Sequence, residues 1–159
     1  MQPRAPDIQA QLTAMRKLEF LVGKWAGEAR ILLSPDGPVE LIQTEEAQYK
    51  LDGLILLIEG VGRTKADGKP ALQALGIVSY DDETGTYRMR AFNDGRFLET
   101  ELKLSGDRND ITWSFTFGQI QTNSLLRITP AGDWTEITEI TVGTQPPMKY
   151  MELTVSRRD

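Results

Sequence analysis

The chain has 159 residues and a formal net charge of −5, and it contains neither cysteine nor histidine. Its length predicts one domain, and its 40% apolar and 26% charged residues are ordinary for a soluble protein. The absence of these two residue types excludes disulfides, thiolate or imidazole metal sites, His-ligated haem, and Ser-His-Asp or Cys-His catalysis. The acidic charge and the scattered Lys and Arg residues argue against a nucleic-acid partner.

Residues 1–6 are rich in proline and predict a loose tail ahead of a single domain over residues 7–159. This tail lacks the apolar run of a signal peptide, and no window of the chain reaches 18 consecutive apolar residues. We therefore expect no membrane span and a cytoplasmic location. The mature form of an exported protein is the alternative.

An amphipathic helix is predicted over residues 7–22. Asp7 is a suitable N-cap, and Gly23 is a natural residue to end the helix because glycine adopts the left-handed conformation readily. One face of the helix is apolar: Ile8, Leu12, Met15, Leu18 and Val22. We expect this face to pack against the end of a barrel.

After Gly23, nine turn signals separate ten segments rich in β-forming residues. The predicted strands are 24–33, 39–51, 54–64, 71–81, 86–93, 96–104, 110–117, 119–129, 134–142 and 148–157. No connection is long enough for a crossover helix, so the strands form an antiparallel meander. Closure removes the two exposed edges of such a sheet. The sequence therefore predicts an all-β fold, a ten-strand antiparallel up-and-down barrel with one N-terminal α-helix; a β-sandwich is the alternative.

The segment Gly23-Lys24-Trp25 after a short helix resembles the Gly-x-Trp entry motif of the calycin superfamily, which includes lipocalins, fatty-acid-binding proteins and nitrobindins. With Asp52-Gly53, Tyr80-Asp81 and Asn93-Asp94-Gly95, the chain looks most like an uncharacterised bacterial group of lipocalin-like ten-strand barrels.

The resemblance implies a structural role for Gly23 and Trp25, with a last-strand arginine stacked over the indole at the closed end. Arg157 matches that position best, and Arg158 is the rival. Nitrobindin-like barrels hold haem through a histidine that this chain lacks, so we expect no cofactor.

Alternate residues of each strand line the lumen of a barrel. The alternation predicts a mostly apolar lumen with a few polar groups, which is typical of a small-molecule site. The candidate ligand-binding residues are Gln43, Glu45, Tyr49, Leu56, Ile58, Arg90, Trp113, Phe115, Phe117 and Met151. The alternative is that these side chains fill the core completely.

Arg88, Arg90 and Phe92 share one face of a strand. Inward arginines would bind a carboxylate or phosphate, but the outward, solvated orientation is favoured because it turns the apolar Met89 and Ala91 inward. Glu45 is the outstanding strand glutamate, since Leu41, Ala47 and Tyr49 lie on the same, inward face. Burial would raise its pKa and suit it to acid–base chemistry.

Two weaker patterns have simple explanations. Gly60-Val61-Gly62 is interpreted as the end of a strand rather than a phosphate loop, and Asp81-Asp82-Glu83 as a hairpin turn rather than a metal site. Ile55 and Leu57 point outward if Leu56 points inward, so the helix or a second subunit must cover them. A homodimer is one prediction from this pattern.

The sequence thus favours binding of a small apolar or amphipathic molecule, with Glu45, Gln43 or Arg90 orienting its polar end. The first alternative is an enzyme of the same shape, an isomerase or hydrolase that uses a buried glutamate with Tyr49 or Tyr150. The second is a filled barrel that acts as a dimerisation or interaction module.

Overall fold

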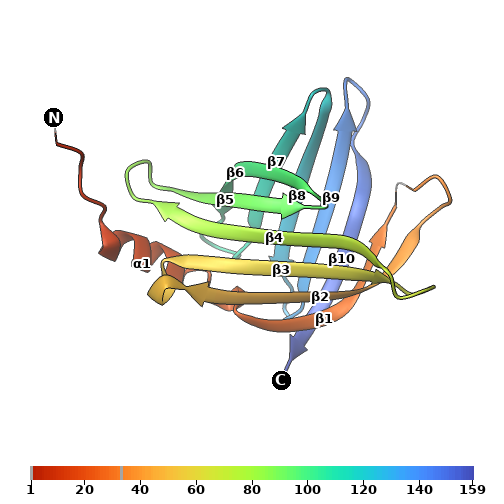
Figure 1. The fold of residues 1–159 in the computed structure, drawn as a ribbon, viewed down its shortest axis with the longest axis horizontal. Helices are drawn as coiled ribbons and strands as arrows, with labels where there is room; N and C mark the ends of the chain where they lie inside the picture. The colour runs from red at the N-terminus through yellow and green to blue at the C-terminus, as the bar shows by residue number, and fades with distance from the viewer. Residues whose placement is uncertain (1, 33) are drawn as a thin grey trace.

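A computed structural model describes residues 2–32 and 34–159 of the chain. It is a closed barrel of ten antiparallel strands with one α-helix at the N-terminus (Figure 1). The strands are β1 (Gly23–Ile31), β2 (Val39–Lys50), β3 (Ile55–Thr64), β4 (Pro70–Asp81), β5 (Thr86–Asn93), β6 (Arg96–Leu104), β7 (Ile111–Phe117), β8 (Ile120–Ile128), β9 (Trp134–Val142) and β10 (Met148–Arg158). Each strand pairs with the next, and β10 returns to pair with β1. The predicted fold class is confirmed.

The strand boundaries follow the turn residues closely. The ranges predicted for β5, β6 and β9 are reproduced to the residue, because tight turns limit both ends of these strands. Met1 in the predicted tail and Leu33 at the end of the predicted first strand lie outside the described residues.

The predicted helix over 7–22 is too long. Helix α1 covers Ile8–Arg16, and the Asp7 side chain accepts a hydrogen bond from the amide of Ala10, as an N-cap does. A separate 3₁₀ turn covers Glu19–Leu21, and Val22 is already extended. Gly23 therefore begins β1 at a φ of 134° and does not end the helix. The break lets Leu18 and Leu21 turn into the barrel, where both are buried.

The helix is fastened to the barrel by two tyrosines. The Tyr49 hydroxyl on β2 donates to the carbonyl oxygen of Met15 at 2.6 Å, and the Tyr87 hydroxyl on β5 donates to that of Ala14 at 2.7 Å. Asp82 in the β4–β5 turn accepts hydrogen bonds from the Asp7 amide and the Gln11 side chain. The acidic turn at 81–83 thus anchors the helix.

Arg157 and Trp25 lie in contact at the closed end. The guanidinium carbon of Arg157 is 4.2 Å from the centroid of the Trp25 ring, and the guanidinium donates to the carbonyls of Phe20 and Val22. A Cβ at residue 23 would fall 2.7 Å from Arg157 Nη1 and displace the guanidinium, and the positive φ also favours glycine at this position.

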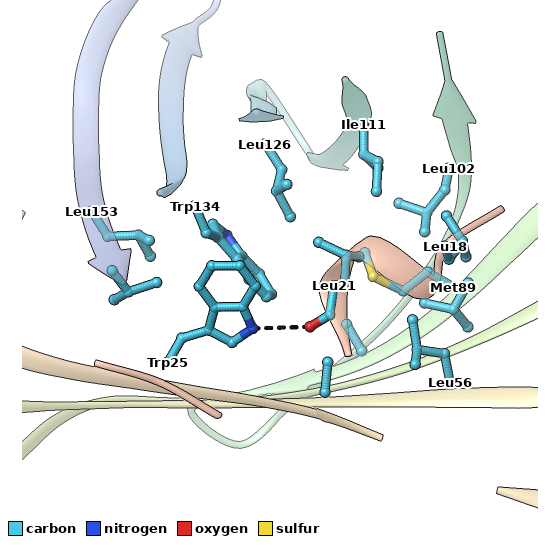
Figure 2. Packing of buried hydrophobic residues seen from close by; sticks show 14 of the residues in the cluster. Leu18, Leu21, Trp25, Leu56, Met89, Leu102, Ile111, Leu126, Trp134 and Leu153 are labelled. Atoms are coloured by element: carbon cyan, nitrogen blue, oxygen red, sulfur yellow. Dashed lines mark hydrogen bonds between the residues drawn. The ribbon is translucent and has the colours of Figure 1, made fainter. Parts of the chain in front are cut away.

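Trp25 also links the 3₁₀ turn to the core. Its indole nitrogen donates to the Leu21 carbonyl at 2.9 Å, and its ring meets the edge of Trp134 at a centroid distance of 5.5 Å. Figure 2 shows Leu21 beside Trp25, and Leu18 farther from the two tryptophans, near Met89 and Leu102. The N-terminal segment therefore plugs one end of the lumen.

The backbone pairing between neighbouring strands is shortest between β6 and β7. Only the pairs Lys103–Thr112 and Leu104–Ile111 continue the ladder there, whereas seven residue pairs join β7 to β8. Farther along, the Thr100 hydroxyl donates to the Ser114 carbonyl at 2.8 Å.

The outer face of β3 carries two apolar side chains. Ile55 and Leu57 are half-buried on the outside of β3, and the homodimer inferred from them stays a prediction.

In the described ranges, no helix combines the length and apolar character needed to cross a membrane.

Candidate functional site

The barrel encloses a cavity of about 450 Å³. Leu18 and Leu21 form its floor at the plugged end. Asp94 and Arg96 from the β5–β6 turn region and Phe117 from the end of β7 lie at its mouth. A volume of this size falls within the usual range of small-molecule sites, so the side chains do not fill this barrel completely.

Seven of the ten predicted ligand-binding residues line the cavity: Glu45, Leu56, Ile58, Trp113, Phe115, Phe117 and Met151. The other three are Gln43, Tyr49 and Arg90. Gln43 is fully buried behind Glu45, and the Tyr49 hydroxyl is committed to the helix. Arg90 lies on the outer surface.

The outward orientation favoured for Arg88 and Arg90 is the one in the structure. Their guanidinium groups lie 4.0 and 3.6 Å from Glu99 on β6, while Met89 and Ala91 turn inward and line the cavity. The Arg90 side chain is 65% exposed, so this pair contributes little to stability. The arginines are therefore absent from the site, and no anion is held by them in the lumen.

Glu45 occupies a niche that two glycines leave open. On β3, Gly60 pairs with Glu45 and Gly62 pairs with Gln43. A Cβ would lie 2.7 Å from both carboxylate oxygens of Glu45 at Gly60, and 2.6 Å from Gln43 Oε1 at Gly62. Gln43 Nε2 donates to Glu45 Oε1 at 2.7 Å. The segment interpreted as a strand end thus makes room for two buried polar side chains.

Glu136 on β9 is a second carboxyl group in the cavity lining. Glu136 is not among the residues predicted from the sequence, because polar residues occupy both faces of β9 and the apolar Ile137 is turned outward. Trp134 is the signal that could have identified it. This large aromatic residue must be buried, and Glu136 shares its face.

Both carboxyl groups titrate near neutral pH. The pKa of Glu45 is raised to about 8, mainly by burial and then by the charge of Glu136, while the hydrogen bond from Gln43 offsets part of the increase. Burial likewise raises the pKa of Glu136 to about 7, although this residue retains contact with the cavity. The Trp134 indole lowers the pKa of Glu136. The N–H group of this indole makes no hydrogen bond of ordinary geometry to any described residue.

The polar groups of the cavity lie largely on β8 and β9. Ser124 and Thr138 share a hydrogen bond between their hydroxyl oxygens at 2.8 Å, and Thr122 lines the cavity on the same strand as Ser124. Together with Glu136 they form a polar strip on an otherwise apolar wall. Such a site suits a molecule with an apolar body and one polar end.

No family model and no curated protein matches this sequence. Solved structures do match it. Rv2717c from M. tuberculosis superposes with a TM-score of 0.71 at 17% identity, over 92% of this chain and 98% of that one. The S-type phycobiliprotein lyase CPES from Guillardia theta superposes with a TM-score of 0.61 at 10% identity, over 99% of this chain and 98% of that one. At these identities the likeness concerns the fold alone, and that fold is the calycin-like ten-strand barrel.

Proposed function

We propose that this protein binds a small amphipathic molecule in the lumen of its barrel. The observation that carries the proposal is the cavity of about 450 Å³, apolar over most of its wall and closed at one end by Leu18 and Leu21. Trp113, Phe115 and Phe117 offer aromatic surface along β7 up to the mouth, where a flat or elongated apolar body would pack. The calycin-like fold supports this proposal only by analogy.

The polar end of the ligand would lie against Glu45, Glu136 and the β8–β9 hydroxyls. Gln43 would act through Glu45, since it is buried behind it and donates to its carboxylate. Tyr49 and Arg90 have no part in this arrangement, because neither lines the cavity.

The first test is mass spectrometry of an organic extract from the purified native protein. A stoichiometric small molecule is the expected result. Ala74→Phe, which fills part of the lumen, should abolish its retention, whereas Gln73→Phe on the outward face of the same strand should retain it. Equal retention by both variants would place the molecule outside the barrel and contradict the proposal.

One observation favours a second candidate, an acid–base enzyme of the same shape. Two carboxyl groups with pKa values of about 8 and about 7 share one cavity, which suits one to donate and the other to accept a proton. Tyr150 lines the cavity and is the available third group, whereas Tyr49 is not. This candidate requires that the extracted molecule, or an analogue of it, be converted by the native protein and not by Glu45→Gln.

A further inference from the structure

The charged groups of the cavity are unevenly distributed. Glu45 and Glu136 lie inside it, and Asp94 and Arg96 lie at its mouth. In the described part of the chain, no Lys or Arg lines the cavity inside this mouth. The interior thus carries two acidic groups and no basic one.

Both carboxyl groups have acceptor capacity that the protein does not use. Glu45 is 7% exposed, and only its Oε1 atom accepts a hydrogen bond from the described residues, the one from Gln43. Glu136 accepts no hydrogen bond of ordinary geometry from the described residues, although the neighbouring Trp134 indole lowers its pKa. Buried polar groups are nearly always hydrogen-bonded, so a ligand is expected to supply donors here.

We propose that the ligand is a basic amphiphile, whose apolar body fills the lumen and whose protonated amine donates to Glu45 and Glu136; this inference rests on the lumenal binding proposed above. A protonated amine brings three donors and one positive charge, and the paired hydroxyls of Ser124 and Thr138 extend the acceptor surface. A carboxylate ligand would instead add a third acid to a cavity that holds no interior base. A neutral ligand would leave the carboxyl groups without a charged partner.

The inference gives binding a definite pH dependence. In the free protein burial raises the pKa of both carboxyl groups toward neutrality, so both bind protons at mildly acidic pH. A cationic ligand must displace those protons, whereas above about pH 8 they are already gone and alkylamines remain protonated to about pH 10. Affinity for the amine therefore rises with pH. Asp94, Arg96 and Tyr150 are the other titratable groups that face the cavity.

The test compares three molecules that share one body: phenylbutylamine, phenylbutanoate and phenylbutanol. Calorimetry on the full chain at about pH 8.5 should give the amine a dissociation constant at least about tenfold lower than the other two. At about pH 6 this preference should shrink severalfold. Phenylbutanol, which has no charge to pair, should bind with the same affinity at both pH values.

Glu45→Gln and Glu136→Gln should each reduce the preference for the amine and weaken its pH dependence, while phenylbutanol binding is retained. Glu99→Gln, on the outer face of β6, is the matched control and should change neither. Equal or tighter binding of phenylbutanoate or phenylbutanol would overturn the inference and leave lumenal binding standing. Failure of all three molecules to bind would also overturn the inference of a basic ligand. Mass spectrometry of the organic extract would then test separately whether the lumen binds any small molecule.

Discussion

Gly60 on β3 lies directly opposite Glu45 on β2, and a Cβ at Gly60 would fall 2.7 Å from each carboxylate oxygen of Glu45. The carboxylate thus fills the space that an ordinary side chain on the neighbouring strand would occupy. A carboxyl group in an apolar lumen is costly to bury unless it is paired. The position of Glu45 is therefore set by three residues together: Gly60 gives the space, and Gln43 and Glu136 set the hydrogen bonding and charge.

We expect Gly60→Ala to lower the free energy of unfolding by about 1–3 kcal/mol, because the new methyl group overlaps the carboxylate. Gly76→Ala is the matched control on β4. Its Cβ would lie 3.5 Å from Met89 Sδ, an ordinary contact, so it should be close to neutral. Urea unfolding measures both variants. The double variant Glu45→Ala/Gly60→Ala should recover part of the loss, and equal stability of the two alanine variants would show that the niche is not tightly packed.

The stability of the barrel should fall as pH rises from about 4.5 to about 8. In this window folded Glu45 and Glu136 hold protons that the unfolded chain has released, since their pKa values rise from the ordinary 4.5 to about 8 and about 7. Each group changes the free energy of unfolding by at most about 1.4 kcal/mol per pH unit.

Urea unfolding at several pH values measures this slope, and the double variant Glu45→Gln/Glu136→Gln should flatten it. The lowered pKa values of Asp82 and Asp110 act below this window, where acid removes their stabilisation. A wild-type slope that survives in the double variant would show that other groups cause it.

Arg157→Ala should destabilise the protein by about 2–3 kcal/mol, because it loses the contact with the Trp25 ring and two charge-assisted hydrogen bonds to the 3₁₀ segment. Arg158→Ala, at the exposed neighbouring position, should change the free energy of unfolding by less than about 0.5 kcal/mol. Thermal or urea unfolding distinguishes the two. Equal effects would mean that Arg157 contributes only surface charge.

Tyr49→Phe and Tyr87→Phe should each cost about 1 kcal/mol, since each removes one hydrogen bond to the end of α1. Amide exchange within Ile8–Arg16 should accelerate more than exchange in the strands, because these bonds hold the plug rather than the barrel. Tyr150→Phe removes a hydroxyl that makes no hydrogen bond to the described residues, and it serves as the control. Unchanged exchange in α1 would show that apolar packing alone holds the plug.

The sequence by itself determined the barrel. Turns such as Asp94-Gly95 require positive φ values that Gly and Asp accept, and they fall between β-branched and aromatic runs, so strand positions and antiparallel order follow from local chemistry. Alternation also placed Glu45, Leu56 and Met151 in the lumen, because side chains on a strand point to opposite faces in turn. The resemblance to calycins put Arg157 over Trp25, where the structure has it.

Only the tertiary structure decided what those residues do. Local patterns end the helix at a glycine, but burial of Leu18 and Leu21 in the barrel breaks it at Arg16 instead. The tyrosine expected in the pocket, Tyr49, is held by a backbone carbonyl 34 positions away, and Glu136 joins Glu45 although 91 positions separate them. Such pairings depend on strand register and closure, which bring distant residues together and which no local pattern encodes.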